Sequence, residues 1–485
     1  MQGFSWFSRV DPDRTAILID HNRFSYGRLA ADTGSLSDWL SAQEVIRGQR
    51  VGIFVPSLYW AWVARFAALC MGLTQVSLSS QSLREQAEVA GPLDLVLGEL
   101  AGHENGTLAR RVICWSPHSF DPLAEQPGFA VPRAGAVDPQ GGGLGVCMLM
   151  TSGTTSRQRV VALDSKRLEA RLGVLQSCQQ VTEKTRLLAS VGPNTMPGFG
   201  YTLATWQAGG TVLFATARER VSRLESNCFV TTPSELQKLL ELDPSPWVNR
   251  ATRRMIVVGG RLPSALRDKA LNQICCQVVV DYGATETNCT ATGDACLLER
   301  HPGAIGFALP GADFEVVDSQ GQKLPPGKEG LVRTRTTNMV HGYGANQEVE
   351  ANVFRDGWFY PGDLGVQFED GMLAITGRVA ETLNLGGTKI PLLDFEAPLQ
   401  RLPEVEDGCA IVLKVDDLDS LALLVVCSDQ TDLGALMQSI ASLLPFRVPF
   451  KLVRVASIPR NSMGKIPRNA LSQLYSEAYR REVGG

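Results

Sequence analysis

Short aliphatic runs that alternate with helical segments are the feature that most restricts the fold of this chain. The first β-type run, Val-Gly-Ile-Phe-Val, begins at Val51 and is followed by a helical segment at 59–71 and an apolar run near Val76. Further helical segments are expected at 234–242 and 264–274. Because runs that are hydrophobic on both faces are typical of parallel strands covered by helices, the sequence predicts an α/β fold. The later runs of this type are 212–214, 228–230, 255–258 and 278–280.

The character of the sequence changes twice further along the chain. After Gly311, short strands with Gly and Pro turns indicate a smaller β-rich lobe, and beyond Gly377 the residues return to a mixed α/β pattern. A chain of 485 residues is also too long for one ordinary core. We therefore expect a large N-terminal domain, 1–377, with parallel-type sheets covered by helices plus the β-rich lobe, and a small α/β C-terminal domain, 378–485.

The composition excludes several classes of partner. A formal net charge of -4 provides no general attraction to nucleic acid or to an anionic membrane. The most apolar stretch, 51–76, is interrupted by Pro56 and Arg65 before it reaches the length of a membrane span. The cysteines are scattered without a C-x-x-C pair, and no signal peptide is visible, so we expect reduced thiols and a cytoplasmic protein. The expected partner is a small molecule or another protein.

A loop rich in small hydroxylated residues follows the apolar run 146–150. Residues 151–159 read Thr-Ser-Gly-Thr-Thr-Ser-Arg-Gln-Arg. Backbone N–H groups, hydroxyls and arginines in such a loop can wrap a polyphosphate. A Walker A loop is excluded because no Gly-Lys-Ser/Thr follows, and a polar surface turn is the alternative when the segment is taken alone. The candidate phosphate-binding residues are Thr151, Ser152, Gly153, Thr154, Thr155 and Arg159.

Four further segments carry polar residues suited to nucleotide chemistry. They are 281–286 (Asp-Tyr-Gly-Ala-Thr-Glu, with a glycine pair upstream at 259–260), 358–365 (Trp-Phe-Tyr-Pro-Gly-Asp-Leu-Gly), 377–390 (beginning Gly-Arg-Val-Ala-Glu) and 458–468 (containing Met-Gly-Lys-Ile-Pro). With the phosphate loop, their order and spacing resemble the acyl-adenylate-forming superfamily of acyl- and aryl-CoA ligases, nonribosomal peptide synthetase adenylation domains and luciferases. The resemblance covers most of the chain from Val51 onward.

This resemblance implies a site for the nucleoside of ATP. Tyr282, which precedes Gly283, would stack on adenine. Gly259 and Gly260 look like the turn beneath the base, where absent side chains let it approach the backbone. Asp363 would take both ribose hydroxyls, which a carboxylate can accept bidentately.

The resemblance also implies which residues carry the chemistry. Thr285 would hydrogen-bond the α-phosphate, and Glu286 would hold Mg²⁺, a cation that prefers oxygen ligands. Lys465 would be the catalytic lysine, because its ammonium can stabilise the charge that develops around the α-phosphorus. Arg378 would contact ribose or phosphate at the hinge of a mobile C-terminal domain. A glycine pair in that domain, Gly386 and Gly387, would let a thiol-bearing arm pass close to the backbone.

The sequence departs from the superfamily pattern at a few positions. In the phosphate loop Ser156 replaces the usual Gly, Gln158 replaces Pro and Arg159 replaces Lys. Pro361 stands where Thr is usual, and Ala380 occupies the hinge position where Asp or Lys is usual. Because Arg keeps the positive charge, ATP binding is expected to survive. The changes leave pyrophosphate handling and the control of domain rotation as open questions.

The implied reaction has two steps. A carboxylate attacks the α-phosphorus of Mg·ATP with release of pyrophosphate, and a thiol, either coenzyme A or the phosphopantetheine of a separate carrier protein, then captures the acyl-adenylate. The acid pocket should include 193–201, in which Phe199, Gly200 and Tyr201 hint at an aryl or short acyl group. No acidic residue between 191 and 211 could pair with a substrate ammonium, which favours a non-amino acid. The alternatives are an amino-acid-adenylating domain and a non-catalytic nucleotide-binding protein.

Overall fold

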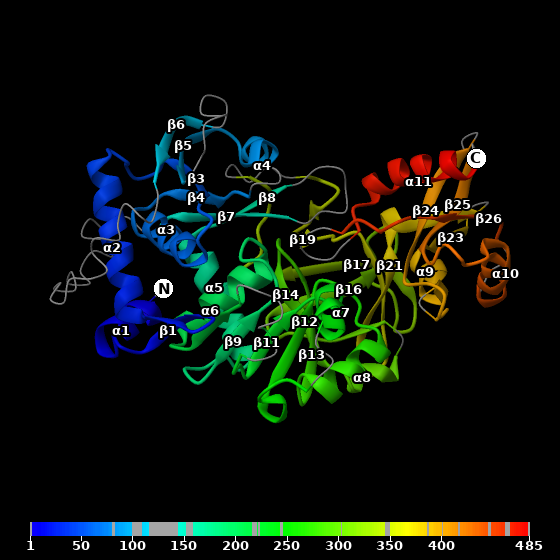
Figure 1. Ribbon diagram of the computed structural model, residues 1–485, viewed down its shortest axis with the longest axis horizontal. Helices are drawn as coiled ribbons and strands as arrows, with labels where there is room; N and C mark the ends of the chain where they lie inside the picture. The colour runs from blue at the N-terminus through cyan, green and yellow to red at the C-terminus, as the bar shows by residue number, and fades with distance from the viewer. Residues whose placement is uncertain are drawn as a thin grey trace.

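The structure of the chain is a computed structural model, shown as a ribbon in Figure 1. It describes residues 2–79, 83–98, 109–115, 144–151, 159–215, 221, 224–242, 246–301, 303–344, 350–385, 388–399, 401–415, 418–444, 448–460 and 466–483. An N-terminal sheet, a central sheet and a small C-terminal sheet succeed one another along its long axis. The two termini lie toward opposite ends of the molecule.

The N-terminal sheet is parallel except at its last strand. It confirms the predicted strand, helix and strand at 51–76. Its strands in spatial order are β6 (Ala109–Cys114), β5 (Leu93–Gly98), β3 (Arg50–Phe54), β4 (Thr74–Ser77), β7 (Val146–Met150) and β8 (Val160–Leu163). The helices of this part of the chain are α1 (Gln2–Val10), α2 (Tyr26–Ala42), α3 (Leu58–Cys70) and α4 (Leu83–Ala90).

The central sheet has a parallel half that contains the four runs predicted to be strands, 212–214, 228–230, 255–258 and 278–280, together with β9 and β1, which are not among the predicted runs. In spatial order it contains β13 (Gln277–Ala284), β12 (Arg254–Val258), β11 (Cys228–Thr231), β9 (Arg186–Ala189), β10 (Thr211–Phe214) and β1 (Thr15–Ile19), with β2 (Asn22–Ser25) antiparallel at the edge. The helices of this half are α5 (Ser165–Cys178), α6 (Met196–Gln207), α7 (Pro233–Leu242) and α8 (Ser264–Gln273).

The other half of the central sheet is antiparallel and corresponds to the predicted β-rich lobe. Its strands in spatial order are β14 (Asn288–Asp294), β15 (Ala304–Ala308), β21 (Leu373–Arg378), β20 (Asp363–Gln367), β17 (Glu329–Thr336), β19 (Trp358–Phe359) and β18 (Phe354–Arg355), and β16 (Ala312–Val317) also pairs with β17. The lobe begins earlier than Gly311, because β14 and β15 precede that residue.

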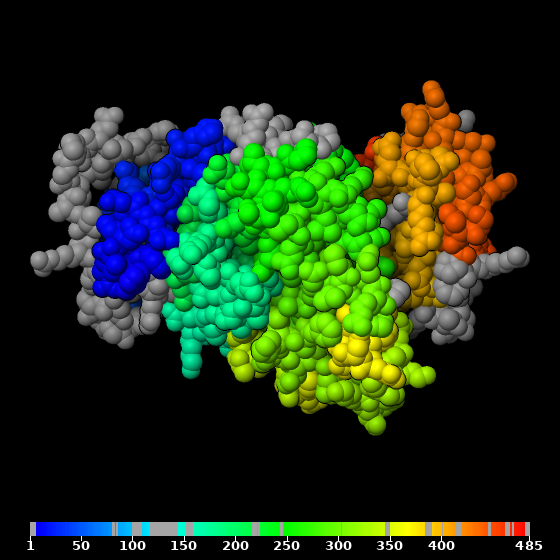
Figure 2. Space-filling model, turned by 90° about the horizontal axis from the view of Figure 1, so that it is seen from below, coloured from blue at the N-terminus to red at the C-terminus, as the bar shows by residue number. Residues whose placement is uncertain are grey.

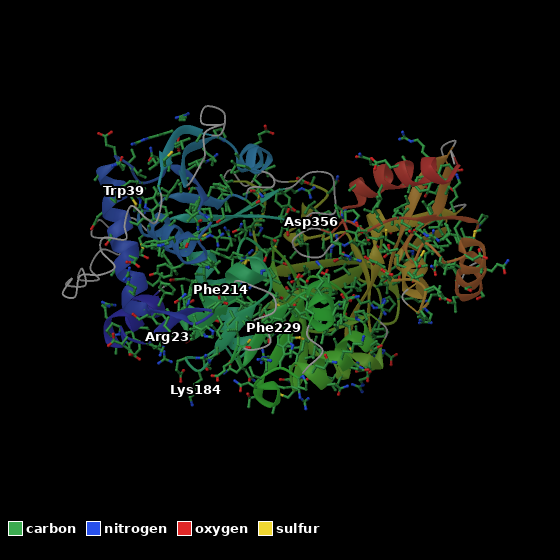
Figure 3. The ribbon with its side chains drawn as sticks, viewed as in Figure 1. Arg23, Trp39, Lys184, Phe214, Phe229 and Asp356 are labelled. Carbon is green, nitrogen blue, oxygen red and sulfur yellow. The ribbon has the colours of Figure 1, made fainter. Side chains whose placement is uncertain are left out.

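Helices lie on both faces of the N-terminal sheet and of the parallel half of the central sheet (Figure 1). Alternate residues of β11 and β12 enter two different cores: Val230 and Ile256 face α5 and α6, while Phe229 and Met255 face α7 and α8. In Figure 3 the labelled Phe229 lies among the strands, and its side chain is 0 % exposed. No helix in the described part of the chain combines the length and hydropathy that a membrane crossing requires.

The last hundred residues form a separate three-stranded sheet with helices on both faces. It contains β24 (Asp407–Val415), β25 (Leu418–Val426) and β26 (Phe450–Arg454), and it follows the hairpin β22 (Thr382–Leu385) and β23 (Thr388–Pro391). α9 (Leu393–Leu399) and α10 (Leu433–Leu443) cover one face, and α11 (Arg468–Val483) covers the other. Figure 2 shows this segment, in orange, at the end of the molecule opposite the blue N-terminal part.

One strand differs from the sequence prediction in a way that matters for the site. We expected a strand at 278–280 with the motif at 281–286 directly after it, but β13 continues to Ala284. Its parallel pairing with β12 ends at Asp281, and beyond that point β14 provides an antiparallel partner. Tyr282 and Gly283 therefore lie within a strand at the boundary between the two halves of the sheet.

Candidate active site

Asp363 joins two strands and a tyrosine at this boundary. It begins β20 and lies opposite Arg378, the last residue of β21, because these strands pair antiparallel. The Tyr282 hydroxyl donates to Asp363 Oδ2 at 2.5 Å, and Arg378 Nε lies 2.9 Å from Asp363 Oδ1. The fold thus brings together three residues from distant motifs that the sequence predicted to contact the nucleoside.

Tyr282, Asp363 and Arg378 are arranged so that one carboxylate oxygen of Asp363, Oδ1, can still accept a hydrogen bond. Burial and the neighbouring Asp363 raise the pKa of Tyr282 well above its ordinary value, so its hydroxyl stays a donor. Burial acts to lower the pKa of Arg378, but Asp363 and Glu381 outweigh it and raise that pKa. Asp363 Oδ1 accepts no hydrogen bond from the described residues, although the Arg378 guanidinium lies beside it. A buried carboxylate oxygen in this state is costly, and a ribose hydroxyl would satisfy it.

A tight turn after β13 carries Thr285 and Glu286. Glycine is required at position 283, just before the turn, because a Cβ there would lie 2.1 Å from the carbonyl oxygen of Asn288. Asn288 itself has φ of 67°, a left-handed conformation that Asn adopts more readily than most residues. The backbone therefore returns sharply, leaving Thr285 half-buried and Glu286 buried at the apex.

The Glu286 carboxylate is held by an aromatic residue from further along the chain. The Tyr343 hydroxyl donates to Glu286 Oε1 at 2.7 Å, and burial together with the charge of Glu286 raises the pKa of Tyr343, which keeps its proton. The Arg159 guanidinium lies 5.1 Å from the centroid of the Tyr343 ring. Arg159 also donates twice to the carboxylate of Glu350, at 2.7 and 2.6 Å. The predicted phosphate-binding arginine thus lies next to the tyrosine that holds the predicted metal-binding carboxylate.

Only the two ends of the predicted phosphate loop are described. The Thr151 N–H donates to the Arg159 carbonyl at 2.8 Å, so the loop leaves and re-enters the antiparallel pair β7 and β8. The Thr151 hydroxyl is buried and has no partner among the described residues. Residues 152–158 lie outside the described residues, and they include Ser152, Gly153, Thr154, Thr155, Ser156 and Gln158.

The predicted glycine turn lies directly beside Tyr282. Val258 pairs with Asp281, so Gly259 and Gly260 leave β12 next to the tyrosine. Gly259 has φ of 82°, which favours glycine. A Cβ on Gly260 would lie 3.6 Å from its nearest neighbour, an ordinary contact, so the protein itself does not demand glycine there. An approaching planar base would be a reason for its absent side chain.

Of the site residues predicted near the C-terminal domain, Arg378 lies in the described part of the chain. Arg378 is followed by a short helical turn, Val379–Glu381, in which Ala380 is exposed. Gly386, Gly387 and Lys465 lie outside the described residues, and their roles stay predictions.

The predicted acid segment, 193–201, forms a loop and the first half of α6. Buried Arg65 from α3 donates to the Pro193 carbonyl at 2.7 Å and to Asn194 Oδ1 at 2.6 Å, so it holds this loop against the N-terminal sheet. A cavity of about 170 Å³ opens beside these residues, at the ends of β3 and β4. The loop therefore has space next to it and a fixed position.

Two aromatic residues of the acid segment face the core. Phe199 stacks on Trp62 with ring centroids 5.8 Å apart. The Tyr201 hydroxyl donates to Oδ2 of buried Asp281. Oδ1 of Asp281 accepts from Gln179 at 2.7 Å and from a threonine of β14. Burial raises the pKa of Asp281 even though the hydrogen bonds from this threonine and from Tyr201 act in the opposite direction.

The sequence of this chain is similar to those of known AMP-binding enzymes. A family model described as AMP-binding enzyme matches residues 4–344, more than half of the chain. The chain belongs to the AMP-binding enzyme family. The indoleacetate–CoA ligase of Aromatoleum aromaticum is 26% identical over 377 residues, which are 73% of this chain and 72% of that protein. The fatty acid–[acyl-carrier-protein] ligase ScoC of Streptomyces coeruleorubidus is 26% identical over 509 residues, 97% of this chain and 95% of that protein.

The chain also has the same fold as a solved structure. ATP-bound MatB from Rhodopseudomonas palustris matches with a TM-score of 0.81 and 24% identity, covering 98% of this chain and 99% of MatB. This AMP-binding enzyme is therefore a member of the acyl-adenylate-forming superfamily, as predicted, and an AMP-forming acid–thiol ligase. Its mixed α/β fold is also confirmed.

Three residues of the AMP-binding enzyme that were not predicted from the sequence contact the Thr285–Glu286 turn or Arg159 beside it. Tyr343 lies between two glycines, a signal that could have marked it. Glu350 and Arg171 lie in segments without a motif, and only the fold places them near the turn.

Proposed function

We propose that this enzyme adenylates a carboxylic acid that carries no ammonium group and then transfers the acyl group to a thiol. The observation that carries the proposal is the meeting of Tyr282, Asp363 and Arg378 beside the Thr285–Glu286 turn, which supplies a ribose acceptor and phosphate-facing groups in one place.

The nucleoside is proposed to bind between the glycine turn and Tyr282. Gly259 and Gly260 leave room for adenine, and Asp363 Oδ1, which lacks a hydrogen bond from the described residues, accepts from the ribose. Arg378 keeps its charge beside that carboxylate and would reach ribose or phosphate.

The Thr285–Glu286 turn is proposed to face the α-phosphate. Thr285 would donate its hydroxyl to a phosphate oxygen. Glu286, oriented by Tyr343, would hold Mg²⁺ together with phosphate oxygens and water. When bound, Mg²⁺ neutralises charge on the phosphate oxygens. Glu350 holds Arg159 nearby, so a phosphate would compete with that carboxylate for the arginine.

Lys465 is proposed to act from a separate C-terminal domain, 378–485, attached at Gly377. In support of this boundary, two hydrophobic clusters, one beginning at Leu383 and the other at Cys409, contain only residues of the C-terminal segment. Lys465 lies in the sequence between β26 and α11. Earlier in the same connection, the Arg460 guanidinium donates to the Asp407 carboxylate at 2.8 Å. Gly386 and Gly387 would line the path of the thiol arm. We also propose that the enzyme is located in the cytoplasm.

The state of Asp281 supports an acid without an ammonium group. Asp281 is a buried carboxylate in contact with α6, the helix that continues the acid segment. Both of its oxygens accept hydrogen bonds from the protein, so it has little remaining capacity to hold a substrate ammonium. An ammonium buried there without a counter-charge would be costly.

The proposal predicts acid-dependent ATP–pyrophosphate exchange. The assay would use a panel of aryl, short-chain, long-chain and dicarboxylic acids together with the amino acids. We expect exchange with at least one non-amino acid, followed by thioester formation with coenzyme A or with a separate carrier protein. Relatives named for each acceptor motivate both arms. Exchange with amino acids alone would contradict the acid assignment, and ATP binding without exchange with any acid would favour a non-catalytic nucleotide-binding protein.

A second prediction concerns the hydrogen bond between Tyr343 and Glu286. Replacing Tyr343 by phenylalanine removes the donor that orients the carboxylate, and loss of such a partner costs about 10- to 100-fold in metal affinity. We expect the Mg²⁺ concentration for half-maximal exchange to rise by about 10-fold, with a smaller change at saturating Mg²⁺. The matched control is Tyr26→Phe, which removes a buried hydroxyl that donates to the Gly210 carbonyl at 2.7 Å. An unchanged Mg²⁺ dependence in Tyr343→Phe would remove Glu286 as the proposed metal ligand.

A further inference from the structure

Arg171 is a fully buried arginine that the proposed chemistry does not use. It lies in α5, where its side chain is 0 % exposed. Its guanidinium donates to three backbone carbonyls: NH1 to Thr285 at 2.7 Å, NH2 to Glu286 at 2.6 Å and Nε to Asn338 at 3.0 Å. Two of these carbonyls belong to the residues proposed to bind the α-phosphate and Mg²⁺.

The partners of this arginine are unusual for a buried charge. Among the described residues, no carboxylate forms an ion pair with Arg171, whereas buried charges are ordinarily paired. Burial lowers the pKa of Arg171 to about 9, with Arg167 acting in the same direction, and Glu286 opposes the shift. The guanidinium therefore stays protonated at neutral pH. A desolvated cation that donates to three carbonyl groups orients those peptide groups strongly.

The contacts of Arg171 connect the turn to two other parts of the site. The Glu286 carbonyl also accepts the Val340 N–H at 2.9 Å, so the turn is fixed to the segment that leads to Tyr343. Arg171 NH1 lies 3.7 Å from Sδ of Met196, the first residue of α6, and Asn288 Nδ2 donates back to the Arg171 carbonyl at 3.2 Å. The Arg171 side chain thus contacts the phosphate-facing turn and the acid-segment helix, and its main-chain carbonyl accepts a hydrogen bond from the strand that returns from the turn.

We propose that Arg171 is a positioning residue that sets the Thr285–Glu286 turn for adenylation and links it to the acid segment. This inference rests on the proposed function, because that function gives the turn its role. Arg171 acts through the turn without touching substrate. A planar guanidinium can reach three carbonyls at once, whereas a lysine ammonium on a single stem cannot reproduce that fork.

The test compares Arg171→Lys and Arg171→Met with the same changes at Arg253. Arg253 is equally buried and also donates to three backbone carbonyls, those of Ser226, Ile274 and Leu224, but it packs on the far side of the central sheet against Trp247. A misplacement of about 1 Å at a reacting group can cost about 10²-fold. We expect kcat for exchange to fall about 10- to 100-fold in Arg171→Lys and further in Arg171→Met. KM for the acid should change by less than about 3-fold, because the substitution removes an interaction that matters in the transition state and not one that binds the acid equally in the ground state and the transition state.

The Arg253 variants separate positioning from stability. They should lower Tm as much as the Arg171 variants while kcat per folded molecule stays at the wild-type value. Equal loss of kcat at both positions, or wild-type kcat in Arg171→Lys, would overturn the proposal. If neither Arg171 variant folds, Asn288→Gly removes the amide that holds the Arg171 carbonyl and keeps the left-handed backbone. Wild-type kcat in Asn288→Gly would also count against the proposal.

A binding measurement separates this inference from the proposed function. ATP affinity, measured calorimetrically with and without Mg²⁺, needs no turnover. If the wild type catalyses no exchange with any acid, the proposed function fails, yet Arg171→Lys should still reduce the gain in ATP affinity that Mg²⁺ provides. An undiminished Mg²⁺-dependent gain in Arg171→Lys would reject the role of Arg171 by itself.

Discussion

Replacing Lys465 by alanine is expected to lower the rate of acid-dependent ATP–pyrophosphate exchange by about 10²- to 10³-fold. Negative charge gathers around the α-phosphorus as the carboxylate attacks and pyrophosphate leaves. An ammonium positioned at that charge is comparable to an oxyanion-hole donor, whose loss costs about 3 to 4 kcal/mol of transition-state stabilisation. The measurement is the initial exchange rate at saturating ATP and acid.

The control for this prediction is Lys451→Ala. Lys451 is an exposed lysine of β26 in the same C-terminal segment, and its ammonium lies 4.9 Å from the Tyr479 ring centroid. Its replacement should leave exchange unchanged. Because Lys465 is proposed to serve adenylation alone, thioester formation from a synthetic acyl-adenylate should also survive in Lys465→Ala. Wild-type exchange in Lys465→Ala would show that the lysine has been assigned wrongly.

Replacing Asp363 by alanine is expected to raise KM for ATP by about 10²-fold. Asp363 Oδ1 would accept a charge-assisted hydrogen bond from ribose, worth about 1.5 to 3 kcal/mol, and a loss of about 3 kcal/mol corresponds to that factor. The protein should also be destabilised by roughly 1 to 3 kcal/mol, since the Tyr282 hydroxyl and the Arg378 guanidinium lose their shared partner. ATP binding by calorimetry and thermal unfolding measure the two effects separately.

Two further variants distinguish nucleotide binding from folding. Asp363→Asn keeps an oxygen that Tyr282 can donate to, so it should recover most of the stability but not the ATP affinity. Asp313→Ala removes an exposed carboxylate that pairs with Arg335 at 2.6 Å, and surface pairs contribute little. It should behave as wild type in both measurements. If Asp363→Asn binds ATP as tightly as the wild type, Asp363 does not hold the ribose.

The sequence predicted the α/β fold because the local pattern and the global architecture agree. The aliphatic or β-branched runs at 212–214, 228–230, 255–258 and 278–280 are buried on both faces. They became strands β10, β11, β12 and β13 of one parallel half-sheet, in which β9 lies between β10 and β11. Such runs can form strands only where helices cover both faces. The resemblance to the superfamily implied that Tyr282, Asp363 and Arg378 all contact the nucleotide, and the fold brings them together.

The length of β13 could not be predicted in this way. The β-branched run ends at Val280, and the strand continues only because β14 returns beside it to pair with Asp281 to Ala284. A partner strand that is brought in by the turn at Asn288 leaves no signal in the residues that it extends. The same is true of Arg159: its charge marked it as a phosphate ligand, but its pairing with Glu350 depends on how two segments almost two hundred residues apart meet.

The sequence by itself determined the architecture, the family and the residues proposed to touch the nucleotide. Hydrophobic periodicity and the order of the motifs can be read from the sequence without knowledge of which residues are in contact. Only the tertiary structure decided what holds those residues in place. Arg171 and Tyr343 act through hydrogen bonds whose partners are distant along the chain, and an interior arginine in α5 looks like any other helical arginine until the Thr285 and Glu286 carbonyls lie against it. Contacts of this kind exist only after the chain has folded, since packing, and not local preference, selects them.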